Sequence, residues 1–309
     1  MSAAHWRLNP ISAAFLVAPA PHSSVATIDR GGSQACAPVK EENYTPIRVG
    51  SVEWISVYEW GCLRIARVLP KDVLNWSNWH DFESMRDGRK IGWLNLYEAS
   101  STVKNDINLT WRMVLKVFPA MENLIQKDKS ALLHNFIPKL WQIGRVLDHI
   151  KILEKYENMN EGDYNSMVLS FYQGSFEKGE EMSDEEILRT FHPFWWYYYT
   201  KMILPIVWMD LERTELMAVI WLLFFDNGYT NISTECQEMC RTMRKMIYLE
   251  LKNYQKSREF DEMRFIETVE TLEIIERGEK KFMEEMMICE MSNIKIHDDF
   301  RKVLRENKL

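Results

Sequence analysis

The chain has 309 residues and a formal net charge of −7, and 46% of its residues are hydrophobic, with 12 Trp among them. This composition provides a sizeable core and excludes a wholly disordered protein. The acidic balance argues against nonspecific nucleic-acid binding, which requires a clustered basic surface. Five cysteines at irregular spacing favour a reducing compartment over a disulfide framework.

The first part of the chain divides near residue 46. Residues 1–45 are rich in Ala, Ser, Pro and Gly and have no sustained hydrophobic period, which predicts a disordered leader before a domain at 46–309. Residues 51–69 predict a first helix. The most apolar stretch, residues 194–225, is interrupted by charged residues, so its uncharged runs are shorter than the roughly 20 residues that cross a membrane.

Two helices are predicted to meet at a corner near Pro119. One apolar face recurs at helical spacing through Val103, Ile107, Trp111, Val114 and Phe118. Pro119 lacks a backbone donor and disfavours helical geometry at Phe118, so this helix should end there. Asp128 is a suitable N-cap for the next helix, which should run to about Glu154.

The remaining chain is predominantly helical by pattern. Residues 155–182 are rich in Gly, Asn and Glu around a short apolar patch at 167–171, which predicts a hairpin or a loose turn. A capping box at Ser183–Glu186 opens a helix to about Trp208. Further helices are predicted at 211–226, 231–257, 264–291 and 297–307. Glu284 and Glu285 are most simply interpreted as part of a solvated helix face.

The corner resembles the ligand-binding domain of nuclear hormone receptors. The string that carries the resemblance is Lys116-x-x-Pro119-x-Met121-x-x-Leu124-x-x-x-Asp128-Lys129-x-x-Leu132-Leu133. Thr214-Glu215 and Arg264-Phe265 are similar to markers of nematode-type receptors, and paired zinc-binding cysteines of a DNA-binding module are missing. The resemblance implies an all-α, three-layer antiparallel sandwich of about ten to twelve helices, with at most a short β-hairpin. It also implies a structural ion pair between Glu215 and Arg264.

The resemblance further implies an interior pocket for a lipophilic ligand. A polar stripe follows the predicted central helix at Asn135, Lys139, Gln142, Arg145 and His149. Either this stripe faces solvent, or Gln142 or Arg145 points into the cavity. The pocket residues expected from the resemblance are Trp111, Gln142, Arg145 and Trp195.

A surface groove for a coregulator helix is also implied. Lys116 falls at the position of the lysine that holds the C-terminal carbonyls of a bound helix, and Lys129 lies nearby. On the terminal helix the expected groove residues are Phe300, Lys302, Val303 and Leu304. Lys302 stands where the family has an acid, and a lysine repels the N-terminal amides of a docked helix. We therefore expect weak coactivator recruitment and a bias toward corepressor-type helices.

The motifs of common enzyme classes do not occur: no Gly-rich phosphate loop, nucleophile elbow or metal-protease signature is present, so we expect no enzymatic activity, cofactor or catalytic metal. We expect a receptor-like transcription regulator in the nucleus, with the cytoplasm as a second location, and with homo- or heterodimerisation through residues 264–291. Direct nucleic-acid binding by this chain and membrane association are not expected. Two alternatives remain open: a carrier of lipophilic ligands inside the cell, and a truncated product of a receptor gene whose DNA-binding module is encoded upstream.

Overall fold

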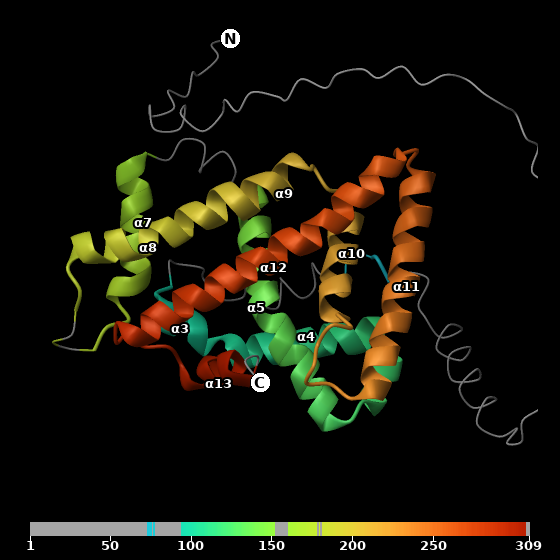
Figure 1. The fold of residues 1–309 in the computed structure, drawn as a ribbon, viewed down its shortest axis with the longest axis horizontal. Helices are drawn as coiled ribbons and strands as arrows, with labels where there is room; N and C mark the ends of the chain where they lie inside the picture. Colours follow the sequence, from blue (N-terminus) through green and yellow to red (C-terminus); the bar gives the residue numbers. More distant parts are fainter. Residues whose placement is uncertain are drawn as a thin grey trace, which may run out of the picture. The chain divides into compact units, whose positions relative to one another are not determined.

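The computed structural model describes residues 73–75, 77, 94–151, 160–177, 179 and 181–306. The leader predicted at 1–45 and the helix predicted at 51–69 lie outside these residues. The described residues belong to the unit Val52–Leu309. They are predominantly helical (Figure 1), with one isolated antiparallel bridge between Phe176 and Ile294. The prediction of an all-α fold is confirmed.

The helices follow one another with short connections. In chain order the elements are α3 (Leu96–Ser101), α4 (Val103–Val117), the 3₁₀ turn η2 (Pro119–Asn123), α5 (Gln126–Lys151), α7 (Glu161–Gln173), α8 (Asp184–Tyr198), the π-helical turn η3 (Tyr199–Ile203), α9 (Leu204–Trp208), α10 (Arg213–Phe224), α11 (Thr234–Ser257), α12 (Glu262–Met291) and α13 (Asp298–Glu306).

Helices α5 and α10 lie at the centre of the bundle. Helix α10 is buried at every position from Glu215 onward, and α5 contacts α4, α10, α12 and α13. In Figure 1, α12 runs diagonally across α5, with α11 beside it at one end. Phe118, at the end of α4, packs edge-on against Trp221 and Phe225 of α10 and its C-terminus, with ring centroids 5.0 and 4.9 Å away. The core is therefore layered helix on helix.

The corner between α4 and α5 forms as predicted, but Asp128 has a different role. Helix α4 ends at Val117, and Pro119 begins η2. Helix α5 begins at Gln126, so Asp128 lies inside its first turn. Its buried carboxylate instead accepts hydrogen bonds from the backbone N–H and hydroxyl of Ser233, at 2.8 and 2.6 Å. Ser233 is the N-cap of α11, so Asp128 fixes the start of α11 rather than the start of α5.

The hairpin or loose turn predicted around residues 167–171 is wrong. This segment is helix α7, and the Asn160 side chain caps it by accepting the N–H of Asp163 at 2.9 Å. Met167, Val168 and Tyr172 bury one side of the helix, which packs against α8. Gly162 lies in the first turn of α7 and Gly174 is its C-cap, positions where glycine does not disrupt a helix.

The aromatic helix predicted to continue to Trp208 contains a π-helical turn. The turn spans Tyr199–Ile203 and separates α8 from α9. Met202 in this turn is buried against Gly278 of α12, where a Cβ would clash with the Met202 sulfur. The close approach of the two elements therefore depends on the missing side chain of Gly278.

Candidate functional site

The corner places two predicted lysines at the surface. Lys116 lies in the last turn of α4 and is exposed. Lys129, in the first turns of α5, holds its ammonium 4.5 Å from the centroid of the Trp111 ring, a cation–π distance. Trp111, expected in the ligand pocket, is half-buried on α4 beneath Lys129. It belongs to the α4–α5 surface in this structure.

The terminal helix α13 packs its apolar face inward. Phe300, Val303 and Leu304 are only 0, 1 and 4% exposed, and α13 contacts α3, α4 and α5. The Phe300 ring stacks on Trp141 of α5 with centroids 4.4 Å apart. These three residues seat α13 on the bundle, because spacing of three and four puts them on one side of the helix. Their part in a coregulator groove stays a prediction.

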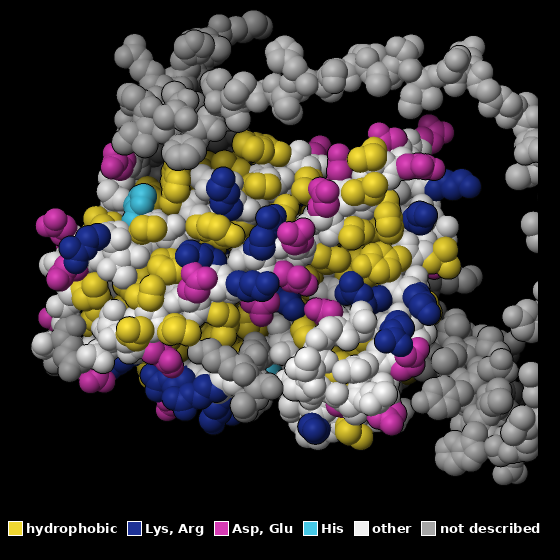
Figure 2. Space-filling view, viewed as in Figure 1, with side chains coloured by type: hydrophobic (Ala, Val, Ile, Leu, Met, Phe, Trp, Pro, Cys, Tyr) yellow, Lys and Arg dark blue, Asp and Glu magenta, His cyan; other side chains and the backbone are white. Residues whose placement is uncertain are grey.

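Lys302 is the predicted groove residue that stays outside. Its side chain is 72% exposed, and its ammonium lies 3.8 Å from the carboxylate of Asp299 one turn earlier. Arg301 beside it pairs with Glu290 of α12 at 3.3 Å. Figure 2 shows Lys and Arg side chains gathering over α13 at the lower edge of this face. The outer face of the terminal helix thus carries the cation Lys302, with Asp298 and Asp299 of the first turn beside it.

A buried polar cluster lies between α5, α7, α8 and α12. Glu285 of α12 has no exposed surface. Its carboxylate accepts hydrogen bonds from the phenol of Tyr172 and from the phenol of Tyr198, the latter at 2.5 Å. The Arg145 guanidinium lies 4.0 Å from this carboxylate and 4.3 Å from the centroid of the Tyr198 ring. Here a buried carboxylate has both a counter-charge and hydrogen-bond donors, as burial requires.

In this Glu285 cluster, burial sets the protonation of the two phenols that donate to Glu285. Burial, followed by the charge of Glu285, raises the pKa of the Tyr172 and Tyr198 phenols well above their usual value. Both phenols therefore remain protonated donors across the physiological range. Trp195, expected in the ligand pocket, donates its indole N–H to the Tyr172 hydroxyl at 3.0 Å. It extends the cluster instead of standing alone in a pocket.

The polar stripe of α5 faces the protein interior, so the solvent-facing interpretation is wrong. Lys139, Gln142 and His149 are buried. Lys139 lies 3.6 Å from both Asp226 and Glu279 and 3.2 Å from the Tyr229 hydroxyl. The stripe is covered because α12 and η3 pack against this side of α5.

Gln142 lies on the interior side of α5, near Gly278 of α12. Its Nε2 is 3.5 Å from the Pro138 carbonyl of its own helix, and its Oε1 has no hydrogen-bond partner among the described residues. An amide so placed offers a buried acceptor to any group that enters this part of the interior.

Glu215 and Arg264 are brought together as the sequence predicts. The guanidinium donates to both carboxylate oxygens of the fully buried Glu215, at 2.8 and 2.5 Å. It also donates to the backbone carbonyls of Met209 and Asp210, both at 2.7 Å. The hydrogen bonds to Glu215 raise the pKa of Arg264 further, although burial opposes them. These bonds tie the start of α12 to α10 and to the α9–α10 connection.

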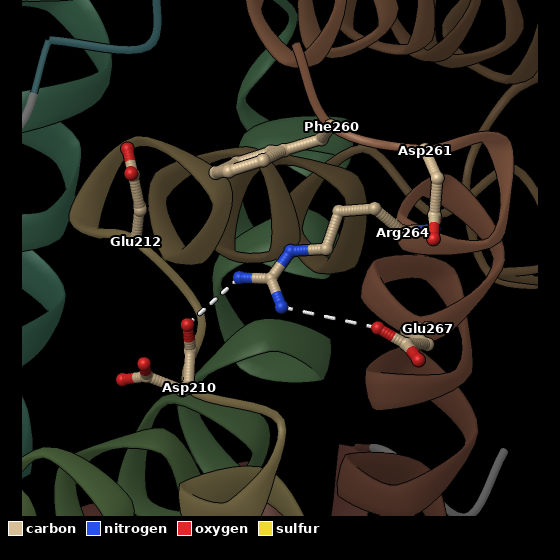
Figure 3. Close-up of a pocket in the computed structure, with 6 residues that line it drawn as sticks. All are labelled: Asp210, Glu212, Phe260, Asp261, Arg264 and Glu267. Atoms are coloured by element: carbon tan, nitrogen blue, oxygen red, sulfur yellow. Dashed lines mark hydrogen bonds and ion pairs between the residues drawn. The ribbon is translucent and has the colours of Figure 1, made fainter. Parts of the chain in front are cut away.

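A pocket of about 380 Å³ opens beside this ion pair (Figure 3). Its lining residues are Asp210, Glu212, Phe260, Asp261, Arg264 and Glu267. Each nitrogen of the Arg264 guanidinium already donates to an oxygen of the chain. The pocket wall therefore presents carboxylates and one aromatic ring, while the Arg264 guanidinium is already engaged by oxygens of the chain. We interpret this arrangement as structural: it supports the fold.

Sequence patterns miss the Glu285 cluster. A signal does exist: Glu285 follows the apolar residues Ile274, Gly278 and Phe282 at helical spacing and precedes Cys289 by four residues. Its neighbour Glu284 is exposed, so only one of the two glutamates lies on a solvated face. Among the described residues, no group of His, Cys, Asp and Glu is arranged to hold a metal ion. Within the same residues, no helix has the length and apolar character to cross a membrane.

Comparison of the sequence with known proteins identifies related chains. Residues 84–292 fit the family model of the ligand-binding domain of nuclear hormone receptor. Nuclear hormone receptor family member nhr-150 of Caenorhabditis elegans is 44% identical over 248 residues, which cover 79% of this chain and 72% of that protein. Family member nhr-16 of the same species is 25% identical over 61% of this chain and 50% of the relative. Family member nhr-28 of Caenorhabditis briggsae is 24% identical over 64% of this chain and 46% of the relative.

A layered helical bundle closed by a short amphipathic helix is the architecture of a receptor ligand-binding domain. The chain belongs to the nuclear hormone receptor family. Proteins of this family are generally non-enzymatic regulators of transcription in the nucleus, and they typically bind coregulators and dimer partners.

Proposed function

We propose that this chain regulates transcription in the nucleus through protein partners that bind around α4, α5 and α13. The observation that carries the proposal is the docked α13, which leaves its polar face outside while Lys116 stands exposed at the end of α4. Lys116 suits the C-terminal carbonyls of a partner helix, because the helix dipole favours a cation there. Lys302 does not suit its N-terminal amides. The preferred partner is thus a longer corepressor-type helix.

Peptide binding to the purified full chain tests this proposal. Fluorescent peptides of the LxxLL type and of the longer corepressor type are titrated against the parent, Lys116→Ala and Lys245→Ala. Lys245 is an exposed lysine on α11, so its removal changes net charge equally at another surface. We expect Lys116→Ala alone to weaken corepressor-type binding by about threefold to fivefold. Equal affinities for the parent and Lys116→Ala would contradict the proposal.

We further propose dimerisation through the first turns of the predicted segment 264–291, at the start of α12. Ile266 at the start of α12 is 48% exposed, and Met263 beside it and Leu249 of α11 are also exposed. Exposed apolar side chains of this size support a partner surface. Sedimentation at several concentrations should show weaker self-association for Ile266→Glu. Met287→Glu, equally exposed at the other end of α12, is the matched control. The same loss in both variants would contradict an interface at the start of α12.

A lipophilic ligand is proposed for the interior near α5. Gln142 and Arg145 support it, because the buried Gln142 has an amide oxygen without a hydrogen-bond partner among the described residues, and the partly buried Arg145 lies one turn further along α5. Native mass spectrometry of the purified protein should detect a co-purifying molecule that dissociates under activation. The carrier alternative shares this ligand but needs neither nuclear accumulation nor peptide binding. Imaging of the tagged full chain together with the peptide titrations therefore distinguishes the two functions.

A further inference from the structure

The seat of α13 is built entirely from side chains of the protein. Phe300, Val303 and Leu304 have almost no free surface. The Phe300 ring lies 4.4 Å from Trp141 and 6.0 Å from Phe282. A small molecule can contact a side chain only where other atoms of the protein leave its surface accessible. The apolar face of α13 offers none, so a ligand has no direct contact by which to hold this helix.

The Glu285 cluster reaches this seat through Phe282. Arg145, which faces the Glu285 carboxylate at 4.0 Å, also lies 5.5 Å from the centroid of the Phe282 ring. Phe282 and Glu285 are one turn apart on α12, so the position of the carboxylate fixes the rotation of the helix face that Phe300 meets.

A second connection runs through α7 to the segment that precedes α13. Tyr172, a donor to Glu285, lies in the last turn of α7. Just beyond that turn, the Ser175 carbonyl accepts the backbone N–H of Lys295 at 2.7 Å, and Phe176 forms the bridge with Ile294. The His297 N–H then donates to the Ser100 hydroxyl of α3 at 2.9 Å. The segment that precedes α13 is thus anchored directly after α7, the helix whose Tyr172 donates a hydrogen bond to the Glu285 carboxylate.

From these contacts we infer that the Glu285 cluster holds α13 closed from within, independently of any bound small molecule. Glu285, Tyr172, Tyr198 and Arg145 are positioning residues: they act on α13 through Phe282 and through the end of α7. This goes beyond the proposed function, because partner binding and ligand binding can each fail while the closed state persists. The surface around α13 would then be constitutively formed, and its use would be set by partner supply.

Amide hydrogen exchange of the full chain tests the inference. The Tyr172→Phe/Tyr198→Phe variant removes both phenol donors from Glu285 while leaving the ring shapes unchanged. We expect the amides of 292–306 to exchange at least about tenfold faster, because a buried carboxylate loses two donors that help to fix α12 and α7. Trypsin, which can cut at Arg301 and Lys302, should cleave α13 correspondingly faster.

A matched variant separates this effect from general destabilisation. Met243→Ala creates a cavity in α11, away from the cluster, and is compared at an equal melting temperature reached by adjusting urea. Faster exchange confined to 292–306 in the tyrosine variant supports the inference. Exchange that rises equally in α11 and α13 overturns it. If the double variant does not fold, Tyr198→Phe alone is measured by the same criteria.

The parent protein provides the second criterion. The chain is stripped of small molecules under denaturing conditions, refolded and checked by native mass spectrometry. We expect unchanged protection of α13 in the stripped protein. Loss of that protection, restored by the co-purifying molecule, would overturn the inference because the ligand would then hold α13.

Discussion

At the scale of single residues, Glu215 depends most directly on one partner. It is fully buried on α10, and Arg264 supplies its counter-charge. Arg264→Leu should lower the free energy of unfolding by about 3–5 kcal/mol, because a buried carboxylate loses that charge. Urea unfolding of both single variants and of the double variant with Glu215→Gln gives the coupling energy, which we expect to exceed about 1 kcal/mol.

The neighbouring pair Glu212–Arg258 is the control for this cycle. Its guanidinium and carboxylate lie 2.9 Å apart, but the Arg258 side chain is 54% exposed and the Glu212 side chain 31%. Arg258→Gln should therefore change stability far less than Arg264→Leu. Additive effects at Glu215 and Arg264 would show that their contact contributes nothing beyond local packing.

Glu279 should give stability a pH dependence of defined sign. Burial raises the pKa of this carboxyl above its usual value, while Lys139 opposes the shift. The folded state therefore binds a proton at pH values where the unfolded state has released it. The contribution to the free energy of unfolding consequently falls as pH rises from the usual glutamate pKa to the raised one. Unfolding titrations of the parent and Glu279→Gln should diverge across that window, with the parent losing more stability.

An exposed glutamate calibrates this measurement. Glu235→Gln on α11 removes one carboxylate from the surface. It is measured in parallel, so that the effect of removing one formal charge can be subtracted from the effect at Glu279. A parent whose stability rises through the same window relative to Glu279→Gln would contradict the assigned direction of the pKa shift.

At the scale of elements, the contact between the π-helical turn and α12 depends on Gly278. A methyl group there would clash with the buried sulfur of Met202. Gly278→Ala should destabilise the protein by about 1–3 kcal/mol despite the better helix propensity of alanine. Combining it with Met202→Ala should cost less than the sum of the two single changes, because the shorter side chain leaves room for the methyl group. Calorimetry of the four proteins measures this; strict additivity would exclude the clash.

Much of the fold was predictable because its signals are local. Pro119 ends α4, and the Ser183–Glu186 capping box begins α8 whatever surrounds them. Asp128 shows where local signals fail: a side chain suited to cap its own helix instead binds Ser233, 105 positions away. That choice is made by the packing of α11 on the corner.

The candidate site was only partly predictable from the sequence. The spacing of Phe300, Val303 and Leu304 reveals an apolar face, but not whether the face lines a groove or a buried seat. The burial of Glu285 was not predicted, because its neighbour Glu284 is a glutamate that is exposed to solvent and the two residues look alike in the sequence. The tyrosines of α7 and α8 together with Arg145 of α5, all brought in by tertiary packing, make its burial tolerable.

At the scale of the whole molecule, the charge on the outer face of α13 should decide which partner helices bind. Lys302 is exposed on that face and would meet the positive N-terminal end of a docked coactivator-type helix. Lys302→Glu replaces this repulsion by attraction. We expect about fivefold tighter binding of an LxxLL-type peptide, by fluorescence anisotropy at low salt, with the gain shrinking as ionic strength rises.

Arg305→Glu is the control that distinguishes an effect of where the charge lies on α13 from an effect of the net charge of the protein. Arg305 is an exposed cation one turn further along α13, and its substitution changes the charge of the protein by the same amount. It should give little of the gain, because the dipole interaction decays within the terminal turn of the partner helix. Equal tightening by both substitutions would mean that long-range charge alone sets affinity. Unchanged affinity in Lys302→Glu would show that the outer face of α13 does not meet the partner at all.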